Sequence, residues 1–333
     1  MKDLGSFIEY EFPVYTGLYD SIPKQDIIAL NSCRAAIYHA VRCYGVSKVW
    51  LATYQCDEVR DFLSKKGIEI LYYSMDEDFN PIFPQETNDS DTAIVLSNYF
   101  GILGDRHFLP LIQRFRNVII DNAQAYFYHP LPGCLNCYSP RKFLAAPDGA
   151  YVIGKDVNRF SYEQGLSSDT SQFLFMRQEY GCDMHIYANK KQNDYRLHDE
   201  DVLLMSPLTD AMIHAADLNR IIEIRKENFR YARKLFDPMN QWSLSRFTDE
   251  DSIPMGYPLM VDFEIIPAFH EAHIYQPRYW EYILDEAKPD CLDYKIAKYM
   301  ALLCIDQRYG KEDIDRQYEI ITQISQAKAG GKL

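Results

Sequence analysis

The sequence predicts an α/β protein with a mostly parallel mixed sheet flanked by helices, followed by a small C-terminal α/β domain. Two observations support this prediction. Short apolar β runs alternate with helical stretches between residues 49 and 121, which is the order of βαβ units in parallel sheets. The chain also has 333 residues, more than the ~250–300 that one hydrophobic core usually serves, so two lobes are expected.

The elements expected in the large lobe follow one another in the order strand 49–53, helix 57–66, strand 68–73, strand 92–97, helix 109–115 and strand 118–121. A further helix begins after the N-cap candidates Asn31 and Ser32 and ends before Gly45, a common C-terminal stop. Because βαβ connections are right-handed, the carboxyl ends of the strands share one edge of the sheet. Open α/β sheets bind their ligands at that edge.

The second half of the chain begins with a polar, tyrosine-rich stretch over residues 154–205, for which no strand order is predicted. Ser206 is a good N-cap and Pro207 suits the first helical position, so a long helix is expected through Phe236. This helix would link the two lobes.

The small lobe is expected to contain a strand at 256–263, a helix at 293–303 and a last helix that starts near Lys311. The predicted domains are therefore a large domain over 1–205, a linking helix and small domain over 206–325, and a disordered tail over 326–333.

Charge, cysteine spacing and hydropathy exclude several classes of protein. The formal net charge of -13 argues against nucleic-acid binding, which needs a basic face. The eight cysteines include one C-x-x-C pair, Cys134 and Cys137, with no second pair to complete a zinc site, so no metal is expected. We interpret this pair as incidental loop thiols rather than a redox motif. The absence of a signal-peptide pattern and of a ~18-residue apolar stretch favours a cytoplasmic protein.

The most informative stretch runs from the predicted strand 118–121 to residue 151. Its strand ends on a carboxylate, Asp121, and Gln124 follows three residues later. The sequence Ser139-Pro-Arg-Lys142 comes next, before the turn Pro147-Asp-Gly149. Taken singly, such an aspartate often caps a helix and a lone lysine is usually a solvated charge. Together they suggest an acid and an amine that share one site at the ligand-binding edge of the sheet.

The order D-x-A-Q, P-x-K, D-G-A resembles the pyridoxal-phosphate (PLP) site of the DegT/DnrJ/EryC1/StrS aminotransferases, which act on sugars. The resemblance implies the type I PLP-dependent transferase fold and PLP as cofactor. It implies that Lys142 is the catalytic residue that forms the covalent link to the cofactor. Asp121 would pair with the pyridinium nitrogen, and Gln124 would touch the ring. A related sugar dehydratase branch has histidine in place of this lysine, so Lys142 favours transamination.

Other cofactor contacts implied by the resemblance depart from the family pattern. The phosphate turn S-G-T-x-A becomes Ser32-Cys33-Arg34-Ala35-Ala36, with cysteine for glycine and arginine for a small hydroxyl residue. The serine that usually lies five residues before the lysine is Cys137 here, and Ser139 is the substitute candidate. Tyr54 is the candidate for stacking on the pyridine ring, although alignment would give that place to Cys56.

The substrate contacts implied by the resemblance are Asn98 and Tyr99 after the strand 92–97, and Arg278, Tyr279 and Trp280 in an aromatic loop. The expected reaction moves an amino group from an amino acid, with glutamate as the first choice, to a keto-sugar. The sugar would be nucleotide-linked and used in surface polysaccharide synthesis, and the enzyme would be a homodimer.

Two alternatives to this reaction remain open. The chain could be a degenerate, non-catalytic homologue that binds a sugar ligand or a protein partner. It could also be a dinucleotide-dependent sugar enzyme, although no G-x-G-x-x-G follows the first strand.

Overall fold

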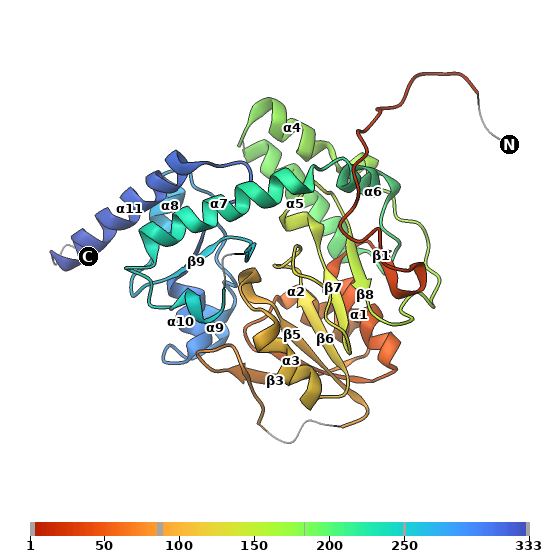
Figure 1. Cartoon of the computed structure of the whole chain (residues 1–333), viewed down its shortest axis with the longest axis horizontal. Coiled ribbons are helices and arrows are strands. Elements are labelled where there is room, and N and C mark those ends of the chain that lie inside the picture. Colours follow the sequence, from red (N-terminus) through yellow and green to blue (C-terminus); the bar gives the residue numbers. More distant parts are fainter. Residues whose placement is uncertain (1–3, 85–88, 183, 249–250, 331–333) are drawn as a thin grey trace.

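The large domain is built on an eight-stranded sheet (Figure 1). The computed structural model describes residues 4–84, 89–182, 184–248 and 251–330. The strand order is β1-β8-β7-β6-β5-β2-β3-β4. The strands are β1 (Ile27–Leu30), β2 (Lys48–Ala52), β3 (Glu69–Met75), β4 (Pro81–Ile82), β5 (Thr92–Ser97), β6 (Val118–Asn122), β7 (Leu135–Tyr138) and β8 (Ala150–Ile153).

The central strands run parallel, as predicted. β3 pairs with β2, β2 with β5, β5 with β6, and β6 with β7 in parallel registers. β8 pairs antiparallel with β1 and β7, and β4 pairs antiparallel with β3 at the opposite edge. The mostly parallel mixed sheet is therefore confirmed. The three four-residue strands β1, β7 and β8 lie outside the predicted set, because each is too short to show a period of its own.

One face of the sheet is covered by α1 (Cys33–Tyr44) and α2 (Asp57–Lys65), whose apolar side chains form one buried cluster with the strands. The ends of α1 match the sequence signals. The Ser32 side chain accepts the Ala35 N–H at 3.3 Å, and Gly45 has a φ of 68°, which lets the chain turn away. On the other face, a larger cluster joins the sheet to α3 (Asp105–Arg114) and to the small domain.

The tyrosine-rich stretch without a predicted strand order forms two helices, α4 (Gln172–Tyr180) and α5 (Met184–Asp199). The long linking helix is divided into α6 (Pro207–His214) and α7 (Leu218–Phe236). The division occurs where the Asp217 side chain accepts the Arg220 N–H at 3.1 Å and caps α7. Ser206 and Pro207 begin α6 as predicted.

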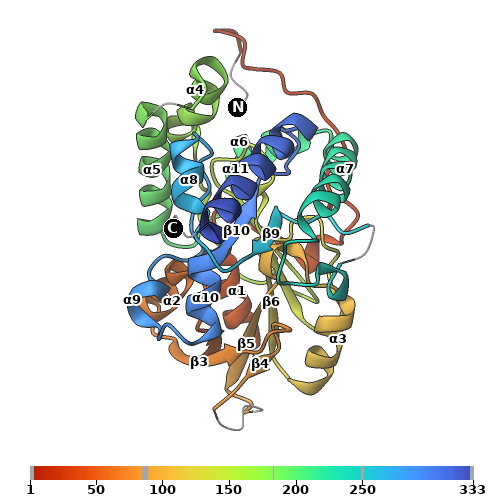
Figure 2. The same ribbon diagram turned by 90° about the vertical axis from the view of Figure 1, so that its left-hand side faces the viewer.

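The small domain contains α8 (Ile266–Glu271), α9 (Ile283–Glu286), α10 (Leu292–Tyr299) and α11 (Lys311–Ala329), together with a pair of strands (Figure 2). These strands are β9 (Tyr257–Met260) and β10 (Met300–Leu303), which are antiparallel. The helix predicted over 293–303 was wrong in its last four residues, because pairing with β9 makes Met300–Leu303 a strand. An apolar run of that length is compatible with either structure until a partner strand is present.

Two further expectations about the chain bear on the thiols and the tail. Cys137 lies inside the buried strand β7, so its interpretation as a loop thiol was wrong, and all eight cysteines are free. α11 extends to Ala329, four residues into the segment predicted to be disordered, and residues 331–333 lie outside the described part of the chain. None of the helices in the described ranges is long and apolar enough to cross a membrane.

Candidate active site

A cavity of about 250 Å³ lies at the carboxyl ends of β2, β5 and β6, beside the N-terminus of α1. It brings together most of the residues predicted for the site. The predicted residues that line it are Ser32, Cys33, Arg34, Cys56, Asn98, Asp121, Gln124, Ser139, Lys142 and Trp280. They come from segments far apart in the chain, and the parallel sheet explains why they meet at one edge.

Asp121 follows the apolar core of β6 and is 8% exposed. Its Oδ1 accepts hydrogen bonds from the Ala123 N–H at 2.9 Å and from the Cys33 thiol at 3.6 Å. Burial, reinforced by the negative charge of Asp121, raises the pKa of the Cys33 thiol well above its usual value. The thiol therefore keeps its proton and acts as a donor to the carboxylate.

Gln55 holds the other oxygen of this carboxylate. Gln55 Nε2 donates to Asp121 Oδ2 at 3.1 Å, and the Ser97 hydroxyl donates to Gln55 Oε1 at 2.5 Å. All three side chains are buried and line the same cavity. Gln55 and Ser97 are not among the residues predicted from the sequence, because a hydrogen bond between the ends of two different strands leaves no local signal. Only the adjacent positions of β2, β5 and β6 in the sheet could have suggested it.

The side-chain amide of Gln124 has a hydrogen-bond partner for its oxygen but none for its nitrogen among the described residues. Its Oε1 accepts the Phe100 N–H at 2.7 Å, which fixes the side chain against the loop that follows β5. Its Nε2 is buried and has no hydrogen-bond partner among the described residues. A buried donor without a partner costs free energy unless a ligand supplies the acceptor. Gln124 therefore offers an N–H donor to whatever occupies the cavity.

Lys142 closes the short helical turn Pro140–Lys142, which follows β7. Its side chain is exposed at the cavity, and its Nζ lies 5.8 Å from the centre of the Tyr279 ring. In the described part of the chain, no carboxylate forms an ion pair with this amine. The amine is therefore accessible to a carbonyl group in the cavity, as a residue that forms a covalent link must be.

The turn after the lysine is clamped by Asp148. Its carboxylate is 1% exposed and accepts the Ser206 N–H at 3.1 Å, the Ser206 hydroxyl at 2.9 Å and the Thr209 hydroxyl. The neighbouring Gly149 has a φ of 110°, and a Cβ there would lie 2.9 Å from the sulfur of Met205. The Asp-Gly pair of the motif thus joins the lysine turn to the start of α6.

Four predicted site residues do not line the cavity. Tyr54 and Tyr99 are buried in the aromatic core, with ring centres 5.6 Å apart, and the Tyr54 hydroxyl donates to the Tyr279 carbonyl. Arg278 is bound to Glu264 at 2.8 Å and to the carbonyls that end α10. Tyr279 does not line the cavity, although its ring centre lies 5.8 Å from Lys142 Nζ. Of the two candidates for the stacking position after β2, Cys56 lines the cavity and Tyr54 does not.

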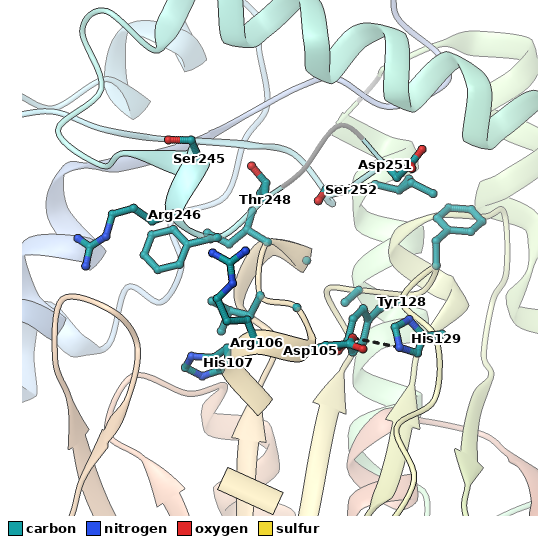
Figure 3. Close-up of a pocket in the computed structure, with 18 of the residues that line it drawn as sticks. Asp105, Arg106, His107, Tyr128, His129, Ser245, Arg246, Thr248, Asp251 and Ser252 are labelled. Carbon is teal, nitrogen blue, oxygen red and sulfur yellow. Dashed lines mark hydrogen bonds and ion pairs between the residues drawn. The ribbon is translucent and has the colours of Figure 1, made fainter. Parts of the chain in front are cut away.

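A second, larger cavity of about 760 Å³ lies at the same edge of the sheet (Figure 3). The loops after β5 and β6 and residues 245–248 and 251–253 line it. Asp105 accepts a hydrogen bond from the Tyr128 hydroxyl at 2.8 Å and pairs with His129 at 3.0 Å. Gly101, which lines this cavity, lies against Gln124 of the smaller one, since a Cβ at Gly101 would lie 2.7 Å from the Gln124 carbonyl oxygen. None of the residues predicted for the site lines this second cavity.

The donor set of the smaller cavity fits PLP, the cofactor implied by the sequence resemblance. Asp121 supplies a buried carboxylate, Gln124 an unpaired N–H, and Lys142 an accessible amine. Arg34, Arg141 and the N-terminus of α1 supply positive charge and N–H groups for a phosphate.

No family model matches the sequence, and no curated protein matches it. Solved structures match over most of the chain. A putative sugar aminotransferase from Streptococcus pneumoniae, Spr1654 in its PLP-form, aligns with a TM-score of 0.62 at 13% identity, covering 94% of this chain and 92% of that one. The sugar aminotransferase CalS13 from Micromonospora echinospora aligns with a TM-score of 0.57 at 15% identity, covering 89% and 87%. A DegT DnrJ EryC1 StrS aminotransferase from Brucella abortus aligns with a TM-score of 0.59 at 14% identity, covering 90% and 85%. These likenesses show that the chain has the fold of the sugar aminotransferases.

Proposed function

We propose that the protein is a PLP-dependent aminotransferase that moves an amino group from an amino acid to a keto-sugar. One observation carries this proposal: Asp121, Gln124 and Lys142 line a single cavity at the carboxyl edge of a sheet whose fold is that of sugar aminotransferases. Glutamate is the proposed donor. A cytoplasmic location and a homodimer are part of the same proposal.

The roles of the residues follow from their chemistry. PLP, when bound, supplies an electron sink for a carbon that has lost its proton. Lys142 is proposed to hold the cofactor covalently and, once released by the donor, to carry the proton of the donor α-carbon on its Nζ. Asp121 would keep the ring nitrogen protonated, since a buried carboxylate favours a positive partner. Gln124 would donate its unpaired Nε2–H to the ring substituent that faces it.

The larger cavity supports a substrate that extends beyond a simple sugar. At about 760 Å³ it exceeds the 250 Å³ of the smaller cavity, and Gly101 in its lining lies against Gln124 in the lining of the smaller one. Arg106 lines it and forms no ion pair with the described residues (Figure 3). A nucleotide diphosphate attached to the sugar would suit this position. The proposed setting is the synthesis of surface polysaccharide.

A non-catalytic homologue is the second candidate, favoured by one observation. The serine that the family uses to bind phosphate is Cys137 here, a fully buried residue of β7 whose side chain packs under α1. If nothing replaces that ligand, the chain would not retain PLP and would bind a sugar or a partner instead.

The visible absorption spectrum with and without added PLP separates these candidates. The wild type should develop a band at ~400–430 nm from the covalent link, and Lys142→Ala should lack it. Lys155→Ala is a matched control, because Lys155 is exposed in the loop after β8 and does not line the cavity. With PLP bound, release of 2-oxoglutarate from glutamate beyond about one equivalent per enzyme should depend on an added nucleotide-linked keto-sugar, which takes up the amino group held by the cofactor. A wild type that stays colourless in excess PLP would refute the proposed aminotransferase activity and favour the non-catalytic homologue.

A further inference from the structure

Two arginines that line the smaller cavity each have an N–H donor without a hydrogen-bond partner among the described residues. Arg34 belongs to the first turn of α1 and is 5% exposed, and Arg141 directly precedes Lys142. Both side chains line the cavity. In each, the Nε–H is buried and has no hydrogen-bond partner among the described residues.

The remaining guanidinium nitrogens hold these side chains in place. Arg34 pairs with Glu58 at 2.5 Å and donates to the Leu197 carbonyl at the end of α5. Arg141 pairs with Asp194 of α5 at 2.8 Å. These contacts fix the two planar groups before any ligand arrives, so little side-chain entropy would be lost when an anion binds.

The charges of the two arginines act on each other. Burial lowers the pKa of Arg34, and the nearby positive charge of Arg141 lowers it further, while Glu58 opposes the change. Each arginine has one carboxylate partner, Glu58 or Asp194, and the two positive charges still repel each other. The Nε–H groups without a partner leave both guanidinium groups able to take an additional anion.

The N-terminus of α1 adds to this preference. The helix has 12 residues, and its first N–H groups have no acceptor within the helix. Ser32 takes the Ala35 N–H with its side chain and the Ala36 N–H with its carbonyl. Cys33 and Arg34, the first two residues of α1, line the same cavity, so the positive end of the helix dipole lies beside it.

We infer that Arg34 and Arg141, with the N-terminus of α1, bind the phosphate group of PLP, so that guanidinium groups take the place of hydroxyl ligands in this chain. This inference rests on the proposed function. It also answers how the chain would retain PLP although Cys137 cannot reach the cavity, because two charge-assisted donors replace the missing hydroxyl.

The test compares the affinity for PLP with the affinity for pyridoxal, which lacks the phosphate. Dissociation constants are measured by equilibrium dialysis in the wild type, Arg34→Met, Arg141→Met and the double variant. Arg233→Met is the control, because the Arg233 side chain is 27% exposed, as is that of Arg141, and pairs with Asp237 on α7 away from the cavity. Each cavity variant should bind PLP about tenfold to hundredfold more weakly and pyridoxal within about threefold of the wild type, the loss expected for one charged hydrogen-bond donor. Inorganic phosphate should compete with PLP only where the arginines remain.

Equal losses of affinity for PLP and pyridoxal, or no loss for either, would overturn the inference. Because Arg34 is buried, Arg34→Met could unfold locally. Arg34→Lys keeps the charge and should recover part of the PLP affinity, and Arg141→Met changes a more exposed side chain. A wild type that binds no PLP would instead refute the proposed function, so the two failures are distinguishable.

Discussion

Replacing Asp148 tests the clamp that joins the lysine turn to α6. The carboxylate accepts two hydroxyl hydrogens and one backbone N–H in a site that is 1% exposed. In Asp148→Ala, the Ser206 hydroxyl can turn to Ser167, whose oxygen lies 2.6 Å away. The Thr209 hydroxyl and the Ser206 N–H keep no such alternative, and each buried unsatisfied donor costs ~1–3 kcal/mol. The expected loss in the free energy of unfolding is about 4 kcal/mol.

Asp148→Asn should be milder. Its remaining carbonyl oxygen can still accept the two hydroxyl hydrogens that Oδ1 receives, so only the Ser206 N–H loses its acceptor. That corresponds to about 1–2 kcal/mol. Urea unfolding measures both losses. An unchanged slope of the unfolding free energy against urea concentration would show that the compactness of the native state is preserved. Asp199→Ala, at an exposed position at the end of α5, is the control and should stay within ~0.5 kcal/mol of the wild type. If both Asp148 variants match this control, the turn is held by other contacts and the reasoning fails.

Two more predictions concern pH and the carboxylate of the site. Burial lowers the pKa of His39 to about 4, and its ring nitrogens contact the Tyr162 hydroxyl and the Val157 carbonyl, both at 2.8 Å. Since the unfolded chain binds this proton at a higher pH, the stabilisation is present above pH ~6.5 and is lost as the pH falls to 4, by up to about 3 kcal/mol. Burial also lowers the pKa of His107 to about 4, so this histidine contributes a similar loss at low pH. His39→Gln should therefore remove about half of the combined loss in the free energy of unfolding, measured by urea unfolding at pH ~6.5 and ~4. An unchanged dependence of this free energy on pH would refute the role of His39. Separately, Gln55→Leu should leave Asp121 Oδ2 without its donor and slow amino transfer about tenfold, or ~1.4 kcal/mol, while PLP still binds; an unaltered rate would mean that Asp121 needs no support from Gln55.

The elements predicted best are those with their own local signals. β5 and β6 are apolar runs long enough to recognise, and α1 and α6 carry capping residues at their first turns. The edge of the sheet that holds the candidate site followed from the alternation of strands and helices. The strands β1, β7 and β8 were not predicted, since each is a short run whose identity as a strand depends on a neighbouring strand rather than on its own residues.

The sequence alone predicts that Asp121, Gln124 and Lys142 share one site, because the order of the motifs and the end of a buried strand are local properties, and the three residues line one cavity in the structure. Which other side chains join them depends on how distant segments pack. Tyr54 and Cys56 are both candidates for the stacking position from the sequence. In the structure Tyr54 is buried in the core, whereas Cys56 lines the cavity. Gln55 meets Asp121, and Arg141 lies near Arg34, only through the packing of distant strands and helices. Hydrogen bonds and charge contacts between such segments arise from the fold as a whole, and no pattern along the chain encodes them.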